Sequence, residues 1–434
     1  MTDRTALVIA DDLTGAADTG NAFARRGAET VVVFDGRSGS TTTPAAAVLV
    51  VNTDSRYTSA EEAAERVDRA VRAHPADLVY KKVDSTLRGN LAAEVDAALA
   101  AAGATLAVVA PAFPANGRVT ACGHHLVDGE LVTDTAAGQD PDAPVGSSHL
   151  PTLLSGSAHP VAHLAVDTVA GGTEAVADGL RTAVANADGP TVVTADATHE
   201  RHLAAVAEGT ATVDPAAVYV GSAGLARHVP LPAIAGAADG TIEADRKRSG
   251  PSRVLGVAGS ASPVTLAQVD AVPEEWVCRI DAARAAVDPP AAATEAVDRC
   301  RDRLSTAGVA LLASATDETD VEAALSAGRE AGLADQQVRD RVARALAETV
   351  ARLQADDPLT GLFVTGGAVA GAVLGELEAE GVRLTGRAVE DGVPVGAIVA
   401  GRAAGTPVVT KAGAFGERTT VNACLAYLRG ENGR

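Results

Sequence analysis

Aromatic residues, cysteines and long apolar runs are scarce in this sequence, and each shortage excludes a class of protein. Phe, Trp and Tyr make up 2% of the 434 residues, so the hydrophobic cores must be built from Ala, Val and Leu. The four cysteines are widely separated, and no CxxC or Cys/His spacing indicates a zinc site or a disulfide framework. No apolar run is long enough to cross a bilayer, and no signal-peptide pattern opens the chain. We therefore expect a cytoplasmic protein with reduced thiols.

Positive charge is also scarce. The chain has 36 Lys and Arg residues against 56 Asp and Glu residues, which gives a formal net charge of -20. Phosphate backbones require clustered Lys and Arg, so we expect no nucleic-acid partner and no anionic membrane surface. Only four lysines occur, and three of them lie in the candidate site segments discussed below: Lys81, Lys82 and Lys411. The acidic surface suits either a cytoplasm of high salt, which screens repulsion between like charges, or a GC-rich genome.

Short runs of β-branched residues alternate with Ala-rich stretches along most of the chain. This alternation is typical of an α/β fold with a mainly parallel sheet, and the length suits two domains. Residues 230–252 contain Pro, Gly and charged residues with little periodicity, which indicates a linker. We predict two domains, each a mainly parallel sheet with helices on both faces. The N-terminal domain is expected at 1–229 and the C-terminal domain at 253–434.

The same pattern predicts the individual elements. In the N-terminal domain we expect helices at 15–26, 60–73 and 90–102, and strands at 5–10, 30–34, 48–52, 77–81, 105–110, 191–194 and 217–220. Residues 123–160 are rich in Gly, Pro, Asp and Ser, and are predicted to form a long ordered loop. In the C-terminal domain we expect strands at 254–257, 277–280, 309–313, 361–365 and 407–410, and helices at 263–271, 295–305, 335–354, 369–380 and 422–428.

Polar side chains follow four predicted strands of the N-terminal domain. Ligands of open α/β sheets bind beyond the carboxyl ends of the strands, so these side chains are candidate binding groups. They are Asp11 and Asp12 after the first strand, Arg56 after the third, and Lys82, Val83, Asp84, Ser85, Arg88, Asn116 and Arg118 after the next two. Helix capping and surface ion pairs are the alternative explanation. That alternative is strong for any single residue and weaker for four strand ends together.

The chemistry of these groups indicates a small acid with several hydroxyl groups. Arg can bind a carboxylate through two parallel hydrogen bonds. Asp carboxylates accept hydrogen bonds from hydroxyls, and one of them can act as a general base. A compact molecule with one carboxylate and several hydroxyls is a sugar acid. The histidines lack neighbours at metal-ligand spacing, and we expect surface or capping roles for His124, His125, His199 and His202.

Three glycine-bearing loops follow strands in the C-terminal domain. Backbone N–H groups at such a loop, and at the helix that follows it, can bind phosphate. None of the loops matches the Walker A or Rossmann pattern, and a single one is often plain turn chemistry. Three in one domain favour a nucleotide site. Its candidate residues are Ser260, Gly366, Gly367, Ala368, Val369, Lys411 and Gly413.

Several of these segments resemble motifs of the four-carbon acid sugar kinase family. They are IADDLTGAADTG at 9–20, YKKVDSTLRGN at 80–90, APAFPANGR at 110–118, VAGSASPVT at 257–265, VTGG at 364–367 and VVTKAGAFG at 408–416. The resemblance spans nearly the whole chain. Within the family it is closer to the D-threonate/D-erythronate kinase branch than to the 3-oxo-tetronate branch.

The resemblance implies that the N-terminal domain holds the sugar acid and the C-terminal domain holds ATP. The reaction would be phosphoryl transfer to the terminal 4-hydroxyl with Mg²⁺. By resemblance the substrate contacts would be Asp12, Arg56 and the segment from Lys82 to Ser85, and the ATP contacts would be Ser260, Gly366, Gly367 and Gly413. Phosphoryl transfer depends mainly on positioning and charge neutralisation. We predict Asp12 as the catalytic base.

Two segments depart from the family pattern. Ala368 and Val369 stand where the family commonly has an acidic residue and Thr, so we expect backbone contacts to the nucleotide there. The usual Arg before an Asp-Pro pair is replaced near Gln139. Three alternatives stay open: a kinase of another small sugar acid such as a 3-oxo-tetronate, a non-catalytic sugar-acid-binding homologue, and a homodimer rather than a monomer. A dehydrogenase is disfavoured because no GxGxxG pattern follows a strand.

Overall fold

The computed structural model describes residues 5–34, 44–140, 143–231, 252–413 and 415–431. They form two compact units, the first made of residues 5–34, 45–140 and 143–231, and the second of residues 44, 252–413 and 415–431. Of the predicted linker at 230–252, residues 232–251 lie outside the described residues. Within the described part of the chain, no helix combines the length and the apolar character needed to cross a membrane.

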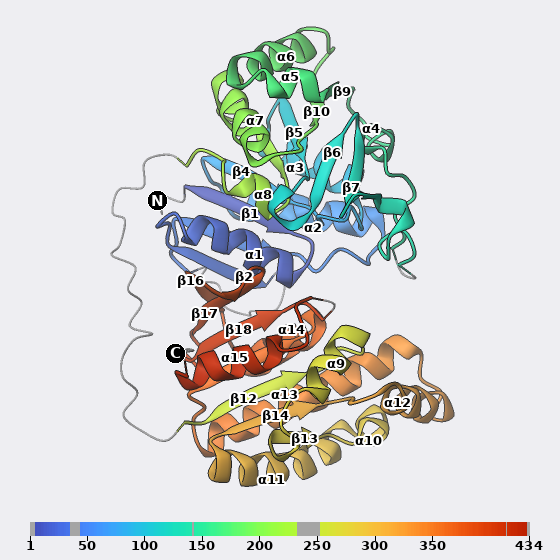
Figure 1. The fold of residues 1–434 in the computed structure, drawn as a ribbon, viewed down its shortest axis with the longest axis vertical. Coiled ribbons are helices and arrows are strands. Elements are labelled where there is room, and N and C mark those ends of the chain that lie inside the picture. The colour runs from blue at the N-terminus through green and yellow to red at the C-terminus, as the bar shows by residue number, and fades with distance from the viewer. Residues whose placement is uncertain (1–4, 35–43, 141–142, 232–251, 414, 432–434) are drawn as a thin grey trace. The chain divides into compact units, whose positions relative to one another are not determined.

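The first unit is built on a sheet in which every neighbouring pair of strands is parallel (Figure 1). Its order is β2-β3-β1-β4-β11-β5-β10-β9. The strands are β1 (Ala6–Ala10), β2 (Thr30–Phe34), β3 (Val48–Asn52), β4 (Leu78–Lys82), β5 (Leu106–Ala110), β9 (Val161–Leu164), β10 (Thr191–Ala195) and β11 (Val218–Gly221). The seven strands predicted for this region are confirmed within one or two residues, and β9 was not predicted.

Helices cover both faces of this sheet. One layer contains α1 (Leu13–Ala24), α7 (Glu200–Val213) and α8 (Ala223–Ala226), and the other contains α2 (Ala60–Ala73) and α3 (Leu91–Ala102). Helix α2 illustrates how these helices are specified by the sequence. One face of it is apolar and packs on the sheet through a buried stripe of Ala63, Val67, Ala70 and Val71. Its N-terminus is capped by the Ser59 hydroxyl, which accepts a hydrogen bond from the Glu62 amide at 3.2 Å. Helices α5 (Val166–Ala170) and α6 (Thr173–Ala185) pack against α7.

The long loop predicted at 123–160 is wrong in part. A small antiparallel sheet contains β6 (Arg118–Ala121), β7 (His124–Val127) and β8 (Glu130–Leu131), and α4 (Leu150–Leu153) follows. The turns between these strands carry the left-handed pairs Cys122-Gly123 and Asp128-Gly129, with φ between 51° and 88°. Such pairs form tight hairpin turns, because their twist matches that of the flanking strands. The Gly and Asp residues therefore mark hairpins rather than an irregular loop.

The second unit has a mixed sheet of order β13-β14-β12-β15-β18-β17-β16. The parallel part contains β12 (Val254–Ala258), β13 (Val277–Arg279), β14 (Val309–Ala313), β15 (Gly361–Thr365) and β18 (Pro407–Lys411). The antiparallel strands β16 (Gly381–Glu390) and β17 (Val393–Val399) complete it. The five predicted strands are confirmed, whereas β16 and β17 were not predicted.

Helices cover both faces of this sheet as well. Helices α9 (Pro263–Asp270) and α15 (Thr420–Arg429) pack together on one face, and α11 (Pro289–Ala307), α13 (Asp335–Asp356) and α14 (Gly367–Glu376) pack on the other. Helices α10 (Ala282–Val287) and α12 (Glu318–Glu330) pack against α13. The predicted fold class, two α/β units with mainly parallel sheets, is confirmed.

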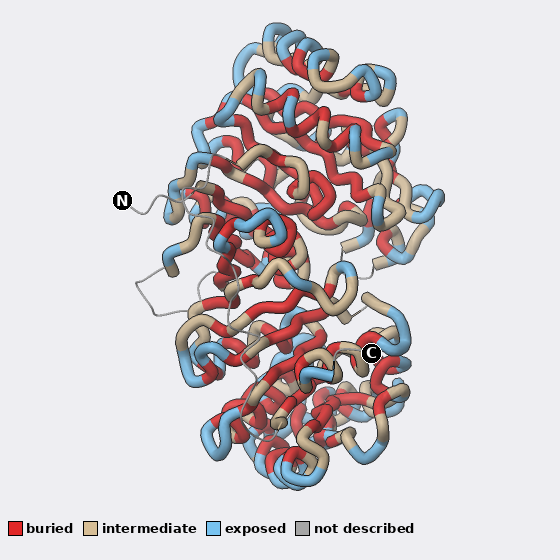
Figure 2. The backbone as a smooth tube through the Cα atoms, turned by 60° about the vertical axis from the view of Figure 1, so that its left-hand side comes forward, coloured by how far each residue is buried: buried red, intermediate tan, exposed pale blue. Residues whose placement is uncertain are grey.

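Burial is concentrated in the central strands of both sheets (Figure 2). β1, β3, β5, β12 and β15 are buried along their whole length, as expected for parallel strands covered on both faces. The side chains are mainly Ala, Val and Leu, with Phe23, Tyr80 and Tyr219 among the few large aromatic ones in the first unit. The cores are therefore assembled from small aliphatic residues, as the shortage of aromatics predicts.

Candidate active site

The strand ends that carry the predicted substrate residues lie level with one another. In the parallel register Ala10 pairs with Asn52 on one side and with Lys82 on the other. Lys82 pairs in turn with Gly221, and Gly221 with Ala110. Side chains just after these residues therefore meet at the carboxyl ends of the strands, where the strand order of the sheet places β1 between β3 and β4. This is the position at which open α/β sheets bind ligands.

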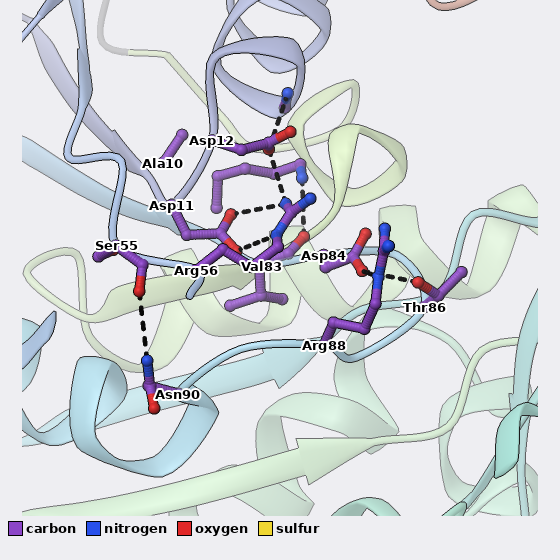
Figure 3. A network of polar contacts seen from close by, with 12 residues as sticks. Ala10, Asp11, Asp12, Ser55, Arg56, Val83, Asp84, Thr86, Arg88 and Asn90 are labelled. Atoms are coloured by element: carbon purple, nitrogen blue, oxygen red, sulfur yellow. Dashed lines mark hydrogen bonds and ion pairs between the residues drawn. The ribbon is translucent and has the colours of Figure 1, made fainter. Parts of the chain in front are cut away.

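Arg56 connects the ends of two strands (Figure 3). Its Nε donates to Asp11 Oδ2 at 2.7 Å, and its Nη2 donates to Asp11 Oδ1 at 3.0 Å and to Asp12 Oδ1 at 2.7 Å. Asp12 Oδ1 also accepts from the Gly15 amide at 3.0 Å, so Asp12 caps α1. Arg56 thus holds the first turn of α1 against the loop that follows β3.

The charges at this strand end stabilise one another. Burial by itself raises the pKa of the Asp11 carboxyl, but the Arg56 guanidinium and the charges of Lys81 and Lys82 more than offset this effect. The pKa of Asp11 therefore lies below its ordinary value. Burial tends to lower the pKa of Arg56, and the neighbouring carboxylates of Asp11, Asp12 and Asp84 raise it well above the usual range. Both partners remain ionised at neutral pH.

Lys82 lies beside Asp12 and belongs to the same group of charged side chains as Asp11 and Arg56. A Cβ placed on Gly15 would come 2.5 Å from Asp12 Oδ1 and 2.7 Å from Lys82 Nζ, so the helix backbone approaches both side chains closely. Lys82 Nζ donates to the Val83 carbonyl at 2.8 Å, and the Val83 amide donates to the Gly221 carbonyl at 3.0 Å. Gly15 was not predicted as a site residue. Its signal in the sequence is a glycine in the first turn of a helix next to two acidic residues.

The loop after β4 contributes a second carboxylate–guanidinium pair. Asp84 Oδ2 accepts from Thr86 Oγ1 and from Arg88 Nε, both at 2.6 Å. Burial raises the pKa of Asp84, but Arg56, Arg88 and Lys82 lower it far below its ordinary value. Arg88 Nη1 also lies 3.2 Å from Asp140 Oδ2. We call Asp11, Asp12, Arg56, Lys82, Asp84 and Arg88 the strand-end cluster. Asp140 was not predicted as part of it.

The backbone of this loop adopts unusual angles. Leu87 has a φ of 62° and is buried, and Gly89 has a φ of 96°. A left-handed Leu costs free energy and persists only where its surroundings fix it. The Leu87 amide donates to the Asp84 carbonyl at 2.9 Å, which closes the turn. The turn places Arg88 where its side chain can reach both Asp84 and Asp140.

His125 packs against this loop through the Ser85 carbonyl. Because the side chain is buried, the predicted surface role is wrong for this histidine. It is fully buried, as His202 nearly is, whereas His124 is exposed. One ring nitrogen lies 2.9 Å from the Ser85 carbonyl and the other 3.0 Å from Thr120 Oγ1. Burial lowers the pKa of His125 below its ordinary value. The neutral ring therefore fixes the loop that carries Asp84 and Ser85.

Two other predicted substrate residues, Asn116 and Arg118, contact each other. Arg118 begins β6, and its Nη1 donates to the carbonyl of Asn116. In the part of the chain that the structure describes, neither side chain hydrogen-bonds to the strand-end cluster. The charges of Arg118 and Asp84 both act on His125, where Asp84 raises the pKa of the ring and Arg118 lowers it.

The glycine-bearing loops of the second unit come together around Ser260. A Cβ placed on Gly413 would lie 2.0 Å from Ser260 Oγ, and one placed on Gly366 would lie 3.5 Å from the Ser260 amide. Gly366 has a φ of 100°, and its amide donates to the Lys411 carbonyl at 3.1 Å. The loops that follow β12, β15 and β18 therefore lie against one another around Ser260.

The other predicted nucleotide residues differ in exposure. Gly367 and Ala368 are exposed at the start of α14, whereas Val369 is buried, and a Cβ on Gly259 would lie 2.3 Å from it. Lys411 is also buried, and its Nζ donates to the carbonyls of Ala412, Gly413 and Phe415 at 2.6, 3.2 and 2.9 Å. Burial lowers the pKa of Lys411 to about 8. Through these hydrogen bonds Lys411 fixes the backbone of the loop that contains Gly413. Val369 is buried beside Gly259.

The described residues contain no group of three or more His, Cys, Asp or Glu side chains arranged to hold a metal ion. Mg²⁺ in nucleotide sites is often held by one or two carboxylates together with phosphate oxygens and water. Such a site needs no preformed protein cage, so the residues present are compatible with Mg²⁺ delivered with a nucleotide.

Two family models match this chain, one in each half. Residues 6–229 match the family model of a sugar-binding N-terminal domain, and residues 255–421 match that of a nucleotide-binding C-terminal domain. A D-threonate kinase of Bordetella bronchiseptica is 37% identical over 439 residues, which cover 97% of each chain. The chain belongs to the four-carbon acid sugar kinase family. The resemblance of the sequence motifs is thereby confirmed.

Two further comparisons concern a second relative and the fold. A 3-oxo-tetronate kinase of Methylobacterium radiotolerans is 32% identical over 422 residues, which cover 94% of this chain and 95% of the relative. The crystal structure of Haemophilus influenzae protein HI1011 has a TM-score of 0.72 and 23% identity, and covers 98% of this chain and 99% of its own. At that identity the likeness concerns the fold alone.

Proposed function

We propose that the protein is an ATP-dependent kinase that phosphorylates the terminal 4-hydroxyl of D-threonate or D-erythronate. The observation that carries the proposal is the strand-end cluster, in which two Arg, one Lys and three Asp side chains meet at one sheet edge of a sugar-binding domain. The kinase activity of the family supplies the reaction, and the D-threonate kinase relative supplies the substrate class.

In this proposal Arg56 and Lys82 bind the carboxylate of the acid. The bonds from Arg56 to the two aspartates use Nε and Nη2, so Nη1 is the donor assigned to the substrate. The aspartates hold the guanidinium in one orientation before substrate arrives, which reduces the entropy lost on binding. Asp84 and Arg88, oriented by their mutual bond, are assigned to the hydroxyl groups. Arg118 and Asn116 are assigned to the edge of the same site.

Asp12 is the proposed general base. Its contacts with Arg56 and with the Gly15 amide both use Oδ1, and its side chain is 26% exposed. Oδ2 is therefore the oxygen assigned to the 4-hydroxyl. A base in this position aligns the hydroxyl and accepts its proton as the oxygen attacks the γ-phosphorus of ATP, while the bond from phosphorus to the β,γ-bridging oxygen breaks and ADP leaves.

The second unit is proposed to bind ATP through its backbone. The loops around Ser260, Gly366 and Gly413 present N–H groups near the start of α14, where the helix dipole favours phosphate. Ala368 and Val369 offer no polar side chain, so the contacts at this turn are assigned to amides and to Ser260 Oγ. Mg²⁺ is proposed to bind with the phosphates and to neutralise charge during the transfer.

An ADP-release assay with Mg-ATP tests the proposal. The acids are D-threonate, D-erythronate, L-threonate, a 3-oxo-tetronate and D-glycerate, each in low and in molar salt, and the phosphorylated carbon is identified by NMR. Turnover of D-threonate or D-erythronate at the 4-hydroxyl is expected. Preference for the 3-oxo-tetronate would move the enzyme to the branch represented by the Methylobacterium relative. Tight binding of an acid without ADP release would indicate a non-catalytic homologue instead.

A further inference from the structure

Lys81 and Glu94 form a buried ion pair on the face of β4 opposite to Lys82. Lys81 and Lys82 are consecutive in β4, so their side chains point to opposite faces of the sheet. Lys82 joins the cluster, whereas Lys81 points toward α3, where its Nζ lies 3.1 Å from Glu94 Oε2. The side chain of Lys81 is 0% exposed and that of Glu94 is 3% exposed. Neither can touch a bound substrate.

Glu94 connects this pair to the loop that carries Arg56. Its Oε1 accepts a hydrogen bond from Ser55 Oγ at 2.7 Å. Ser55 Oγ lies 2.8 Å from Thr53 Oγ1, which donates to the Ala10 carbonyl at 2.9 Å. Two backbone bonds continue the connection, because the amides of Ser55 and Arg56 both donate to the Asp11 carbonyl, at 3.0 and 3.3 Å. The chain of contacts runs from Lys81 to the residue next to Arg56.

The pair also acts on the cluster through charge. The positive charge of Lys81 helps to lower the pKa of Asp11, and the negative charge of Asp11 adds to the burial that raises the pKa of Glu94. A buried ion pair is a weak source of stability, since removing two charges from water costs about as much as their attraction returns. The position of this one, between α3 and the Arg56 loop, indicates a role in geometry.

We propose that Lys81 and Glu94 are positioning residues, which hold Ser55 and thereby fix Arg56 and Asp11 in the orientation that binds the sugar acid. This inference rests on the proposed function of the strand-end cluster. Lys81 keeps Glu94 in place beneath the loop. Glu94 holds the Ser55 hydroxyl, and Ser55 sets the backbone of Arg56. The pair should therefore influence the binding of the acid and leave the binding of ATP unchanged.

Ser55→Ala is the central variant, because it cuts the link and leaves the ion pair intact. We expect the KM for the sugar acid to rise about tenfold, the order of a lost hydrogen bond to a charged group, with the KM for ATP within about twofold of the wild-type value. Amide hydrogen exchange at residues 55 and 56 should accelerate about tenfold. The matched control is Ser59→Ala, four residues away, which removes the cap of α2. It should lower Tm and change neither KM nor exchange at the loop.

The double variant Lys81→Met/Glu94→Leu is the second test, since replacing both buried charges with apolar groups avoids an unpaired charge. It should stay folded and show the same rise in sugar-acid KM. Wild-type KM and exchange rates in a folded Ser55→Ala protein would overturn the positioning role. If Ser55→Ala does not fold, a double variant with wild-type kinetics would overturn it. A folded wild-type enzyme without turnover would overturn the proposed function. In that case the amide exchange rates at residues 55 and 56, compared between wild type and Ser55→Ala, would decide whether the hydrogen bond from Ser55 to Glu94 fixes the loop that carries Arg56.

Discussion

The carboxylate of Asp11 and the guanidinium of Arg56 form a two-bond pair, with 2.7 Å between Nε and Oδ2 and 3.0 Å between Nη2 and Oδ1. Both side chains are nearly inaccessible to solvent. A planar guanidinium matches a carboxylate in this way, whereas an ammonium group acts as a point charge. The pair fixes the direction of the Arg56 plane, and with it the direction of the donor that we assign to the substrate.

Arg56→Lys should therefore weaken binding of the sugar acid although the charge is kept. We expect the KM for the acid to rise about tenfold or more, and the KM for ATP to stay within about twofold, because the second bond to Asp11 and the fixed orientation are lost. Steady-state kinetics with each substrate varied in turn measures this. Arg72→Lys is the control, since Arg72 pairs with Asp68 on the exposed face of α2. Equal KM values for the acid in wild type and Arg56→Lys would refute the assignment.

Gly15→Ala should impair activity through a steric effect. The added methyl group would lie 2.5 Å from Asp12 Oδ1 and 2.7 Å from Lys82 Nζ, so one of the two side chains must move. We expect kcat/KM for the acid to fall about tenfold or more with little change in Tm, because Ala is otherwise favoured over Gly in a helix. Gly156→Ala is the control, since a Cβ there meets nothing within 4 Å. Unchanged kinetics would show that Asp12 and Lys82 need not keep their present positions.

Gly413→Ala should act on the nucleotide alone. A Cβ at this position would lie 2.0 Å from Ser260 Oγ and 2.7 Å from Ser260 Cβ, so the loop must shift away from Ser260. We expect the KM for ATP to rise about tenfold and the KM for the acid to stay constant. In the double variant Gly413→Ala/Ser260→Gly both clashing atoms are gone, and part of the ATP affinity should return. A rise confined to the KM of the acid would contradict the assignment of this loop.

Because His125 is buried, we expect the stability of the folded protein to depend on pH. Its pKa in the folded protein lies below the ordinary value of 6.5, because burial disfavours the charged ring. Below about pH 6.5 the unfolded chain therefore binds a proton that the folded chain resists, and stability is lost as pH falls, by up to about 1.4 kcal/mol per pH unit. Unfolding in urea between pH 8 and 5.5 should show a smaller slope in His125→Gln. The control His124→Gln, at the exposed neighbour, should keep the wild-type slope.

The strands were predictable because their residues are uniformly apolar and β-branched. β2, β3, β14 and β15 begin and end where the sequence predicts. β16 was missed although Val382 and Leu384 alternate with Arg383 and Thr385, which is the pattern of a half-buried strand. Helix α7 was missed because its buried His202 and Gly209 do not look like core residues. Isolated polar residues obscure an apolar stripe when they are buried by tertiary contacts.

The candidate site was predictable where its residues are local to the strand ends. Asp11, Arg56 and Asp84 follow three strands that the parallel register aligns, and only the sheet topology was needed to bring them together. Glu94 and His125 were not predictable, because each contacts the site loops only through a partner far along the chain. The Ser55 partner of Glu94 lies 39 residues away, and the Ser85 partner of His125 lies 40 residues away. Sequence spacing carries no signal for such pairs.

The measurement that tests the account most directly is ADP release from saturating Mg-ATP with D-threonate and D-erythronate, by wild type and by Asp12→Asn. Asn caps a helix as well as Asp does, so the variant should keep the wild-type Tm while losing the base. The account predicts turnover of at least one acid by the wild type, and a kcat lower by about 100-fold or more in Asp12→Asn. Wild-type kcat in the variant would contradict the role of Asp12. No turnover of either acid by a folded wild-type protein would contradict the proposed function.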